Sequence, residues 1–288
     1  MDDKIGYISQ ATVDTIKPDC LAPAQIAQKA LNLAVGKTQL AYGKLFVLSL
    51  LAGAYIGLGA MFFLLVSSDA SLPFAAGKVL GAFAFCTGLY LVITAGSELF
   101  TGDCLMVMAW VNKKISLAAM LKVLVVVWIG NLIGSIALAL LVHASNFGAL
   151  NAGAVATTAV SVAAAKTALP TTVMFAKAIM CNFMVCLAVW CSYATRTLVD
   201  KFFSILLPII GFVACGFEHS VANMFFLPLG LIESLSSTAN LSGLVLTHLN
   251  IAGICFNLAL VTLGNIVGGA VLVGLAYYYI FCKKESGK

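Results

Sequence analysis

The segment CGFEHSVANM, residues 215–224, interrupts an apolar run that is otherwise typical of a membrane-spanning helix. It places Glu218, His219 and Asn223 among side chains as hydrophobic as lipid, where polar groups are costly and usually mark a pathway or a site. We therefore take His219 as the candidate central residue of a pore. The alternative is a packed histidine whose ring is hydrogen-bonded to a neighbouring backbone carbonyl.

The composition indicates a multi-spanning helical membrane protein. Of the 288 residues, 62% are hydrophobic and 9% are charged, whereas about a quarter of the residues in a soluble domain carry charge. Several apolar stretches reach the roughly 20 residues that a helix needs to cross a bilayer core, and the alternating pattern of an outer-membrane barrel is absent. The first 44 residues are polar, so we expect no signal peptide.

Two apolar stretches have a length that points to broken helices. Residues 79–111 and 202–232 are too long for one straight span and too short for two spans joined by a turn. We expect one break at AGSELFTGD, residues 95–103, and the other at CGFEHSVANM. The remaining spans are predicted at 46–66, 123–142, 172–193 and 254–281, with a polar, alanine-rich connection at 144–170.

Outside this channel domain, which we place at residues 45–282, the chain has two short segments that we expect in the cytoplasm. Residues 283–288 form a tail, and residues 1–44 contain an amphipathic helix. The apolar face of that helix is predicted to carry Ala22, Ile26, Ala30, Leu33 and Ala34.

The lysines and arginines predict the orientation in the cytoplasmic membrane. With six spans, the positive-inside rule places both termini in the cytoplasm, because only Lys78, Lys166 and Lys177 then fall elsewhere. The cations on the cytoplasmic side are Lys4, Lys17, Lys29, Lys37, Lys44, Lys113, Lys114, Lys122, Arg196, Lys201, Lys283, Lys284 and Lys288. This distribution requires each broken stretch to count as one span.

The two halves of the chain also resemble each other. Each break is followed by a span with a related motif, GNLIGS at 130–135 and GNIVGGA at 264–270. Repeats of three spans, an odd number, place the second copy upside down relative to the first. We therefore predict an all-α protein of six transmembrane helices in two inverted three-helix repeats, with the two breaks meeting near the midplane.

Two helix breaks that meet near the midplane could bind an anion, because helix N-termini present free backbone N–H groups. Thr101 and Ser220 could add hydroxyl donors, and His219 can donate or hold a proton near neutral pH. Aromatic and aliphatic side chains beside the breaks could line a dry constriction or simply pack. They are Phe85, Leu89, Leu99, Phe100, Phe212 and Phe217.

The remaining polar residues near the breaks have structural and functional interpretations. Glu98 and Glu218, each after a glycine-containing turn at Gly96 or Gly216, are expected to tie down loop amides; a proton relay is the alternative. Asn131 and Asn265 are expected to brace the loops. Lys166 could concentrate anions or be an ordinary solvated charge.

The nine cysteines lie mostly in apolar runs, and we interpret them as small buried hydrophobic residues. No metal-ligand spacing, nucleotide-binding motif or nucleophile constellation is present in the sequence. We therefore expect no metal, no cofactor, no enzymatic activity and no nucleic-acid partner.

Four motifs, in order, resemble those of the formate/nitrite transporter family. They are SELFTG (97–102), KAIMCNFMVCLAVW (177–190), GFEHSVANM (216–224) and VTLGNIVGGA (261–270), and the likeness runs from about residue 25 to residue 282. The resemblance implies an aquaporin-like protomer in a homopentamer, with one pore in each protomer. It also implies transport of small monovalent anions, as a channel or a proton-linked carrier: formate, nitrite, hydrosulfide, acetate or lactate.

The resemblance also implies roles for individual residues. His219 would be the central histidine, Thr101 its partner and Lys166 the lysine of the vestibule. One constriction would contain Phe85, Leu89 and Phe212, and the other Leu99, Phe100 and Val185. The polar positions near the pore would be Asn182, Asn223 and Asn265. Asp103 departs from the family pattern.

The substrate stays open at this point. GSELFTG is similar to nitrite-type members, whereas CNFMVCLAVW is similar to formate channels, so we expect formate first, with nitrite or hydrosulfide as alternatives. A neutral-solute channel of the aquaporin type is the alternative from another class. The paired NPA motif of aquaporins is missing from this sequence.

Overall fold

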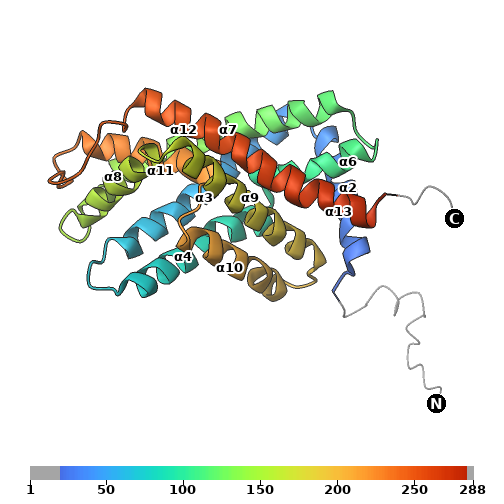
Figure 1. Cartoon of the computed structure of the whole chain (residues 1–288), viewed down its shortest axis with the longest axis horizontal. Helices are drawn as coiled ribbons and strands as arrows, with labels where there is room; N and C mark the ends of the chain where they lie inside the picture. The colour runs from blue at the N-terminus through green and yellow to red at the C-terminus, as the bar shows by residue number, and fades with distance from the viewer. Residues whose placement is uncertain (1–19, 284–288) are drawn as a thin grey trace, which may run out of the picture.

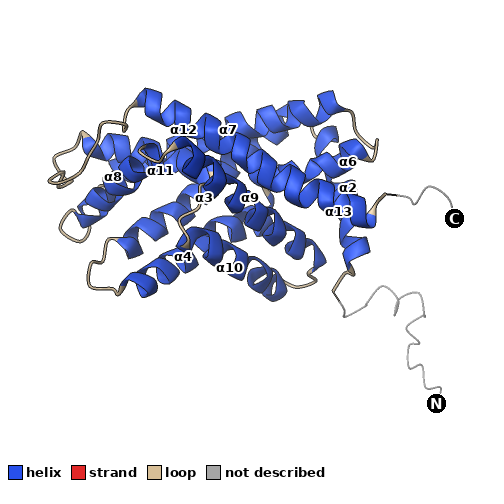
Figure 2. Cartoon of the chain, viewed as in Figure 1, coloured by secondary structure: helices blue, strands red, loops and turns tan. Residues whose placement is uncertain are grey.

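The computed structural model describes residues 20–283, and all regular secondary structure in this range is helical (Figure 2). Five helical stretches among these residues are long and apolar enough to cross a membrane. They are Tyr42–Ser67 (α3), Phe74–Gly96 (α4 and a π-helical turn), Leu117–Ala144 (α7), Thr171–Ala194 (α9) and Ile251–Phe281. The last comprises α12 (Ile251–Ile266), a π-helical stretch (Val267–Leu275) and α13 (Ala276–Phe281).

Both predicted helix breaks are present. After α4 (Phe74–Leu91) and its π-helical turn, the chain is extended at Ser97 and Leu99 and becomes helical again in α5 (Phe100–Asp103) and α6 (Val107–Val111). After α10 (Leu198–Ala214), the chain is extended at His219 and enters α11 (Ser220–Ser234). In Figure 1, α4 and α10 lie side by side and lead toward the two breaks at the centre of the molecule.

Glycine permits the sharp change of direction at each break. Gly96 has a φ of 79° and Gly216 a φ of 65°. This left-handed region is sterically unfavourable for residues with a Cβ atom. The two glycines, which occupy equivalent places in the two repeats, therefore end α4 and α10 in the same way.

The connection predicted at residues 144–170 contains a helix that the sequence analysis did not predict. This helix, α8 (Ala154–Thr167), packs against α11, with Ala159 and Ala163 beside Gly230. A Cβ atom on Gly230 of α11 would lie 2.3 Å from the Cβ of Ala163, so the two backbones are very close. The alanine content of this segment favours a helix; small side chains then allow it to pack tightly, which is why it is more than a linker.

The N-terminal helix is α2 (Pro23–Gln39), which contacts α6, α9 and α13 (Figure 1). Its buried face differs by part of a turn from the predicted one, because Leu33 is 39% exposed and Ala22 lies before the first turn. The buried residues are Ile26, Ala27, Ala30, Leu31 and Ala34. The predictions for residues 1–19 and 284–288, including Lys4, Lys17, Lys284 and Lys288, lie outside the described residues.

Small residues bring the membrane helices together in both repeats. A Cβ atom on Gly134 of α7 would lie 2.0 Å from the Leu50 carbonyl oxygen of α3. In the second repeat, a Cβ atom on Gly268 would lie 2.1 Å from the Ile179 carbonyl oxygen of α9. The GxxxG spacing in these helices thus produces equivalent close crossings, as expected for small-residue packing in membranes.

We expect Gly134→Ala to lower the free energy of unfolding by about 1–3 kcal/mol, because the new methyl group overlaps the backbone of α3. Gly43→Ala is the matched control, because no atom lies within 4 Å of a Cβ at that exposed helical position. Thermal unfolding of the purified protein in detergent measures both. Equal melting temperatures for the two variants would contradict the close crossing.

Candidate functional site

An asparagine holds each break in place. Asn131 Oδ1 accepts from the Phe100 N–H at 2.9 Å, and its Nδ2 donates to the carbonyls of Ser49 and Glu98 at 2.8 and 2.9 Å. The side chain is fully buried. A single amide thereby ties the start of α5 to α3 and α7, using both its acceptor and its donor groups.

The second repeat has the same arrangement. Asn265 Oδ1 accepts from the Ser220 N–H at 2.8 Å, and Nδ2 donates to the carbonyls of Ala178 and Glu218 at 2.8 and 2.9 Å. Phe100 corresponds to Ser220 and Glu98 to Glu218 in the repeat, so both amides bind equivalent backbone groups. This agreement at the level of single hydrogen bonds establishes the inverted repeat, and the predicted bracing role of both asparagines matches the geometry.

His219 lies at the start of α11 with a defined orientation. Its Nδ1 accepts from the Ala222 N–H at 3.0 Å and caps the helix, and its Nε2 lies 3.0 Å from Thr101 Oγ1. A ring nitrogen that accepts from an N–H carries no proton, so the proton of the neutral imidazole is on Nε2. His219 therefore presents an N–H donor toward the other break.

Three cavities follow one another through the protein. The Lys166 vestibule, about 190 Å³, is lined at its inner end by Phe85, Phe212 and His219. The same three residues line a central chamber of about 10 Å³. The chamber shares Leu89 and Leu99 with the Lys37 vestibule, which is about 390 Å³.

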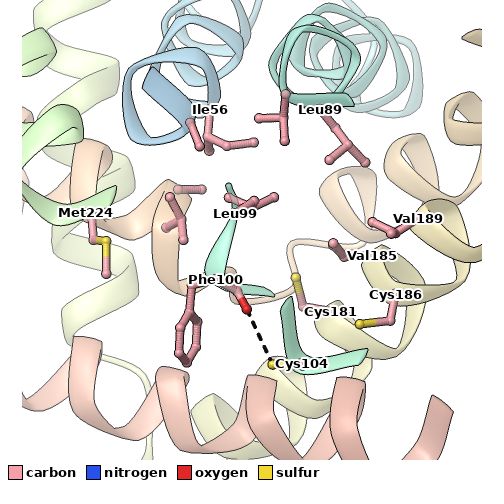
Figure 3. Packing of buried hydrophobic residues seen from close by; sticks show 14 of the residues in the cluster. Ile56, Leu89, Leu99, Phe100, Cys104, Cys181, Val185, Cys186, Val189 and Met224 are labelled. Carbon is pink, nitrogen blue, oxygen red and sulfur yellow. Dashed lines mark hydrogen bonds between the residues drawn. The ribbon is translucent and has the colours of Figure 1, made fainter. Parts of the chain in front are cut away.

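The central chamber is apolar apart from His219. Its other walls are Ile56, Phe85, Leu89, Leu99, Val185, Ile209 and Phe212. Figure 3 shows Ile56 and Leu89 opposite Leu99, with Val185 beside them. Phe85 and Phe212 meet edge to face with ring centroids 5.8 Å apart, and the Phe212 ring stacks on His219 at 5.8 Å. The chamber is thus a short dry passage between two larger spaces.

Both glutamates at the breaks bind lysines, so the expectation that they tie down loop amides is wrong. Glu218 Oε1 accepts from Lys166 Nζ at 2.9 Å, and Oε2 accepts from Asn223 Nδ2 at 2.7 Å. Glu98 pairs with Lys37, which extends from α2 and also pairs with Asp103. The asparagines already hold the loop backbone, which leaves the carboxylates to fix a lysine at each vestibule.

The charge of Lys37 is well stabilised. Burial alone would lower the pKa of its ammonium group, but the adjacent carboxylates of Asp103 and Glu98 raise that pKa above its usual value. Lys37 therefore stays protonated throughout the physiological range.

Several predicted site residues lie near the cavities without lining them. Thr101 contacts His219 but does not line the chamber, and Asn182 donates to the carbonyls of Thr101 and Asn265 at 3.2 and 2.7 Å. Those predicted residues that do not line any of the three cavities are Phe100, Thr101, Asn182, Asn223 and Asn265. All five are at most 4% exposed. Ser220 is also buried, and its hydroxyl has no hydrogen-bond partner.

Several residues that line the cavities were not predicted from the sequence. Ile56 and Ile209 lie in the chamber but look like any other apolar span residue in the sequence. Lys78 and Lys177 line the Lys166 vestibule. They did carry a signal, because with Lys166 they are the three cations that fall outside the cytoplasmic side in the predicted topology. Lys37 was predicted only as one of the cytoplasmic cations, although its ammonium group pairs with Glu98 and Asp103 at the break.

The described part of the chain offers no cluster of three histidine, cysteine or carboxylate side chains suited to a metal ion. The buried cysteines Cys86, Cys104, Cys181 and Cys186 are free thiols. In Figure 3, Cys104 donates to the Phe100 carbonyl within the packed interior. These four agree with the expectation of small buried residues, but Cys20, Cys191, Cys215 and Cys255 are exposed on the single chain, so the expectation is wrong for them.

These features define a membrane transport protein built from two inverted repeats, whose broken helices meet at a narrow passage between two vestibules. Comparison with known proteins agrees with that class. The model of the formate/nitrite transporter family matches residues 24–279, and the chain belongs to this family.

Individual relatives match over nearly their whole length. The chain is 34% identical over 278 residues to the formate channel FocA of Escherichia coli K12, covering 93% of this chain and 97% of that protein. It is 38% identical over 273 residues to the nitrite transporter NirC of Salmonella typhimurium LT2, covering 94% and 93%. A solved pentameric formate channel with formate bound is 36% identical with a TM-score of 0.78, covering 84% of this chain and 98% of the other.

We expect Asn265→Ala to lower the free energy of unfolding by at least about 3 kcal/mol, because it leaves buried backbone groups at the second break without partners. Asn265→Asp should destabilise as well, since a carboxylate cannot donate to the carbonyls of Ala178 and Glu218. Asn32→Ala, on the exposed face of α2, is the control. Thermal melting in detergent tests the set, and a stable Asn265→Asp variant would contradict the role of the two donated bonds.

Proposed function

We propose that this protein is a transmembrane channel or transporter for small monovalent anions of weak acids, with formate as the first substrate and passage either passive or coupled to protons. The observation that carries the proposal is the alignment of the three cavities, with the His219 N–H at the narrow chamber between two lysine-lined vestibules.

Each vestibule can concentrate anions. Lys78, Lys166 and Lys177 line one of them, and Lys29, Lys37 and Lys201 the other. Glu218 offsets one of the charges in the first vestibule, which leaves it positive. Because long-range attraction raises the local concentration of an oppositely charged solute, an anion collects at the mouth before it meets the dry chamber.

The central chamber then determines the free-energy barrier to passage of the anion. An anion stripped of water by Phe85, Leu89, Leu99 and Phe212 loses much of its solvation free energy. The Nε2–H of His219 can donate a hydrogen bond that replaces one of those lost. If the anion at this point also takes up a proton from vestibule water, while His219 stays neutral, it becomes the neutral acid, which crosses apolar surroundings more easily. Thr101 is positioned to bind Nε2 when the anion is absent.

We assign the substrate pathway to His219, Thr101 and Lys166 together with the walls and supports of the cavities. These are Phe85, Leu89, Leu99, Phe100, Val185, Phe212, Asn182, Asn223 and Asn265. Gly96, Glu98, Gly216 and Glu218 have structural roles at the breaks.

The relatives support the assembly and the location. The solved relative is a pentameric channel with formate bound, and we propose the same homopentamer here, with a pore in each protomer. Many large apolar side chains are exposed on the single chain, such as Phe83, Leu141 and Phe203, as lipid or subunit contact requires. We place the protein in the cytoplasmic membrane with residues 1–44 and 283–288 in the cytoplasm, on the charge distribution given above.

Nitrite or hydrosulfide is the alternative main substrate, because NirC, a nitrite transporter, is as similar to this chain as the formate channels are. Acetate, lactate and a neutral solute are further candidates. Uptake of formate, nitrite, hydrosulfide, acetate, lactate and glycerol into proteoliposomes across a pH series tests the proposal. Fast glycerol swelling without formate uptake would instead indicate an aquaporin-type channel.

The two functions of His219 can be separated by mutation. An asparagine side chain in its place would still accept from the Ala222 N–H, as asparagine is a favoured helix cap, but it offers no donor at the position of Nε2. We therefore expect His219→Asn to retain stability yet lose most formate uptake and its pH dependence. His219→Phe should also lose about 1 kcal/mol of stability with the cap. Formate uptake in proteoliposomes and thermal melting measure these effects; a wild-type pH profile in His219→Asn would rule out proton sharing.

Lys177→Gln removes a charge from the Lys166 vestibule without breaking the Lys166–Glu218 pair. Formate uptake should fall most at low ionic strength and approach the wild-type rate at high salt, because salt screens the attraction. Lys122→Gln, an exposed lysine that lines none of the cavities, is the control. The same fractional loss at every salt concentration would argue against electrostatic concentration.

A further inference from the structure

The two helix breaks, residues 96–103 and 216–223, differ at one acidic position. Asp103 lies five positions after Glu98, and Asn223 lies five positions after Glu218. On the Lys166 side, one lysine faces one carboxylate, and the Asn223 amide donates to that carboxylate at 2.7 Å. On the Lys37 side, one lysine contacts two carboxylates. The Lys37 cluster therefore contains one more negative charge than its counterpart.

The additional carboxylate is deeply buried. Asp103 is 2% exposed; its Oδ1 accepts from Lys37, and its Oδ2 has no hydrogen-bond partner. A cavity of about 10 Å³ adjoins Asp103 and Lys37, with Leu105, Met106 and Tyr193 among its walls. This space holds at most about one water molecule. Among residues 20–283, Oδ2 therefore has no donor to stabilise a charge, and an ionised oxygen in that situation is costly.

Among residues 20–283, the salt bridges that Asp103 and Glu98 form are both with Lys37. Lys29, also from α2, donates to the Tyr193 carbonyl at 2.8 Å rather than to a carboxylate. Lys201 from α10 lines the Lys37 vestibule, and Tyr193 of α9 lines the 10 Å³ cavity next to Asp103.

We propose that Glu98 and Asp103 form a proton-binding site, in which Asp103 takes up one proton while Glu98 stays ionised opposite Lys37. Two carboxylates that share one ammonium group leave a net buried negative charge, and such pairs bind a proton more readily than isolated carboxylates. The proton comes from water of the Lys37 vestibule and forms an O–H bond at Oδ2. The Lys37 cluster then changes from a net charge of −1 to neutral.

The site makes the two vestibules respond differently to pH. The Lys166 cluster contains one cation and one carboxylate, so it has no surplus charge to neutralise. If the proposed function holds, protonation of Asp103 removes a negative charge from the Lys37 mouth, and anions enter more readily from that side when it is acidified. The pathway is then asymmetric in its pH dependence although its scaffold is symmetric.

Infrared difference spectroscopy of the purified full-length protein tests the site without depending on transport. On acidification, the wild type should develop the C=O stretching band of a buried protonated carboxyl group at a higher pH than exposed carboxylates do. Asp103→Asn, which copies the Asn223 pattern, should lose that band. Glu98→Gln should lose it too, because the charge of Lys37 then balances the Asp103 carboxylate alone and favours its ionised form. Asp69→Asn, at an exposed loop position, should retain it.

A wild type without the band, or an Asp103→Asn variant that retains it, would overturn the proposal. If Asp103→Asn does not fold, the wild type and Glu98→Gln decide the question. Formate efflux from vesicles in which the Lys37 vestibule faces the lumen tests the consequence. Acidifying the lumen should accelerate efflux in the wild type, and Asp103→Asn should lose this response. An unchanged response in Asp103→Asn would refute the role in transport, whereas absence of formate flux in every protein would count against the proposed function alone.

Discussion

Two buried amides hold this protein in its working conformation. Asn131 and Asn265 each use one acceptor and two donated hydrogen bonds to hold a helix break against the neighbouring helices. Backbone groups inside a bilayer core have no water to bind, so irregular segments survive there only when the protein satisfies them. Asn131 and Asn265 supply those partners for the backbone at Glu98, Phe100, Glu218 and Ser220.

The breaks create the site because they stop two helices in the middle of the protein. The His219 ring can then cap α11 with one nitrogen and present the other toward Thr101. The same stop leaves space beside Leu99 and Phe212, which becomes the central chamber. A functional donor and a dry constriction therefore both follow from the way in which the helix ends are held.

A symmetric scaffold supports asymmetric chemistry in this fold. The asparagine clamps, the positive-φ glycines and the lysine–glutamate pairs repeat in both halves. Two of the positions that differ bear on the chemistry: Leu99 occupies the place of His219 at the chamber, and Asp103 the place of Asn223 beside a lysine–glutamate pair. Because the clamps bind backbone atoms, these side chains can change without disturbing the geometry of the breaks.

The sequence by itself determined the helical class, both breaks and the pairing of the two halves, because bilayer thickness limits span length and a polar cluster in an apolar run is expensive. It also singled out His219 and Thr101, which the structure places 3.0 Å apart. The partners of the carboxylates were decided only by tertiary structure, since Lys37 and Glu98 are far apart in the chain and meet through the docking of α2. The position of helix α8 and the lining roles of Ile56 and Ile209 were likewise decided by packing. The sequence of an alanine-rich segment, or a single isoleucine, does not indicate which surface it will face.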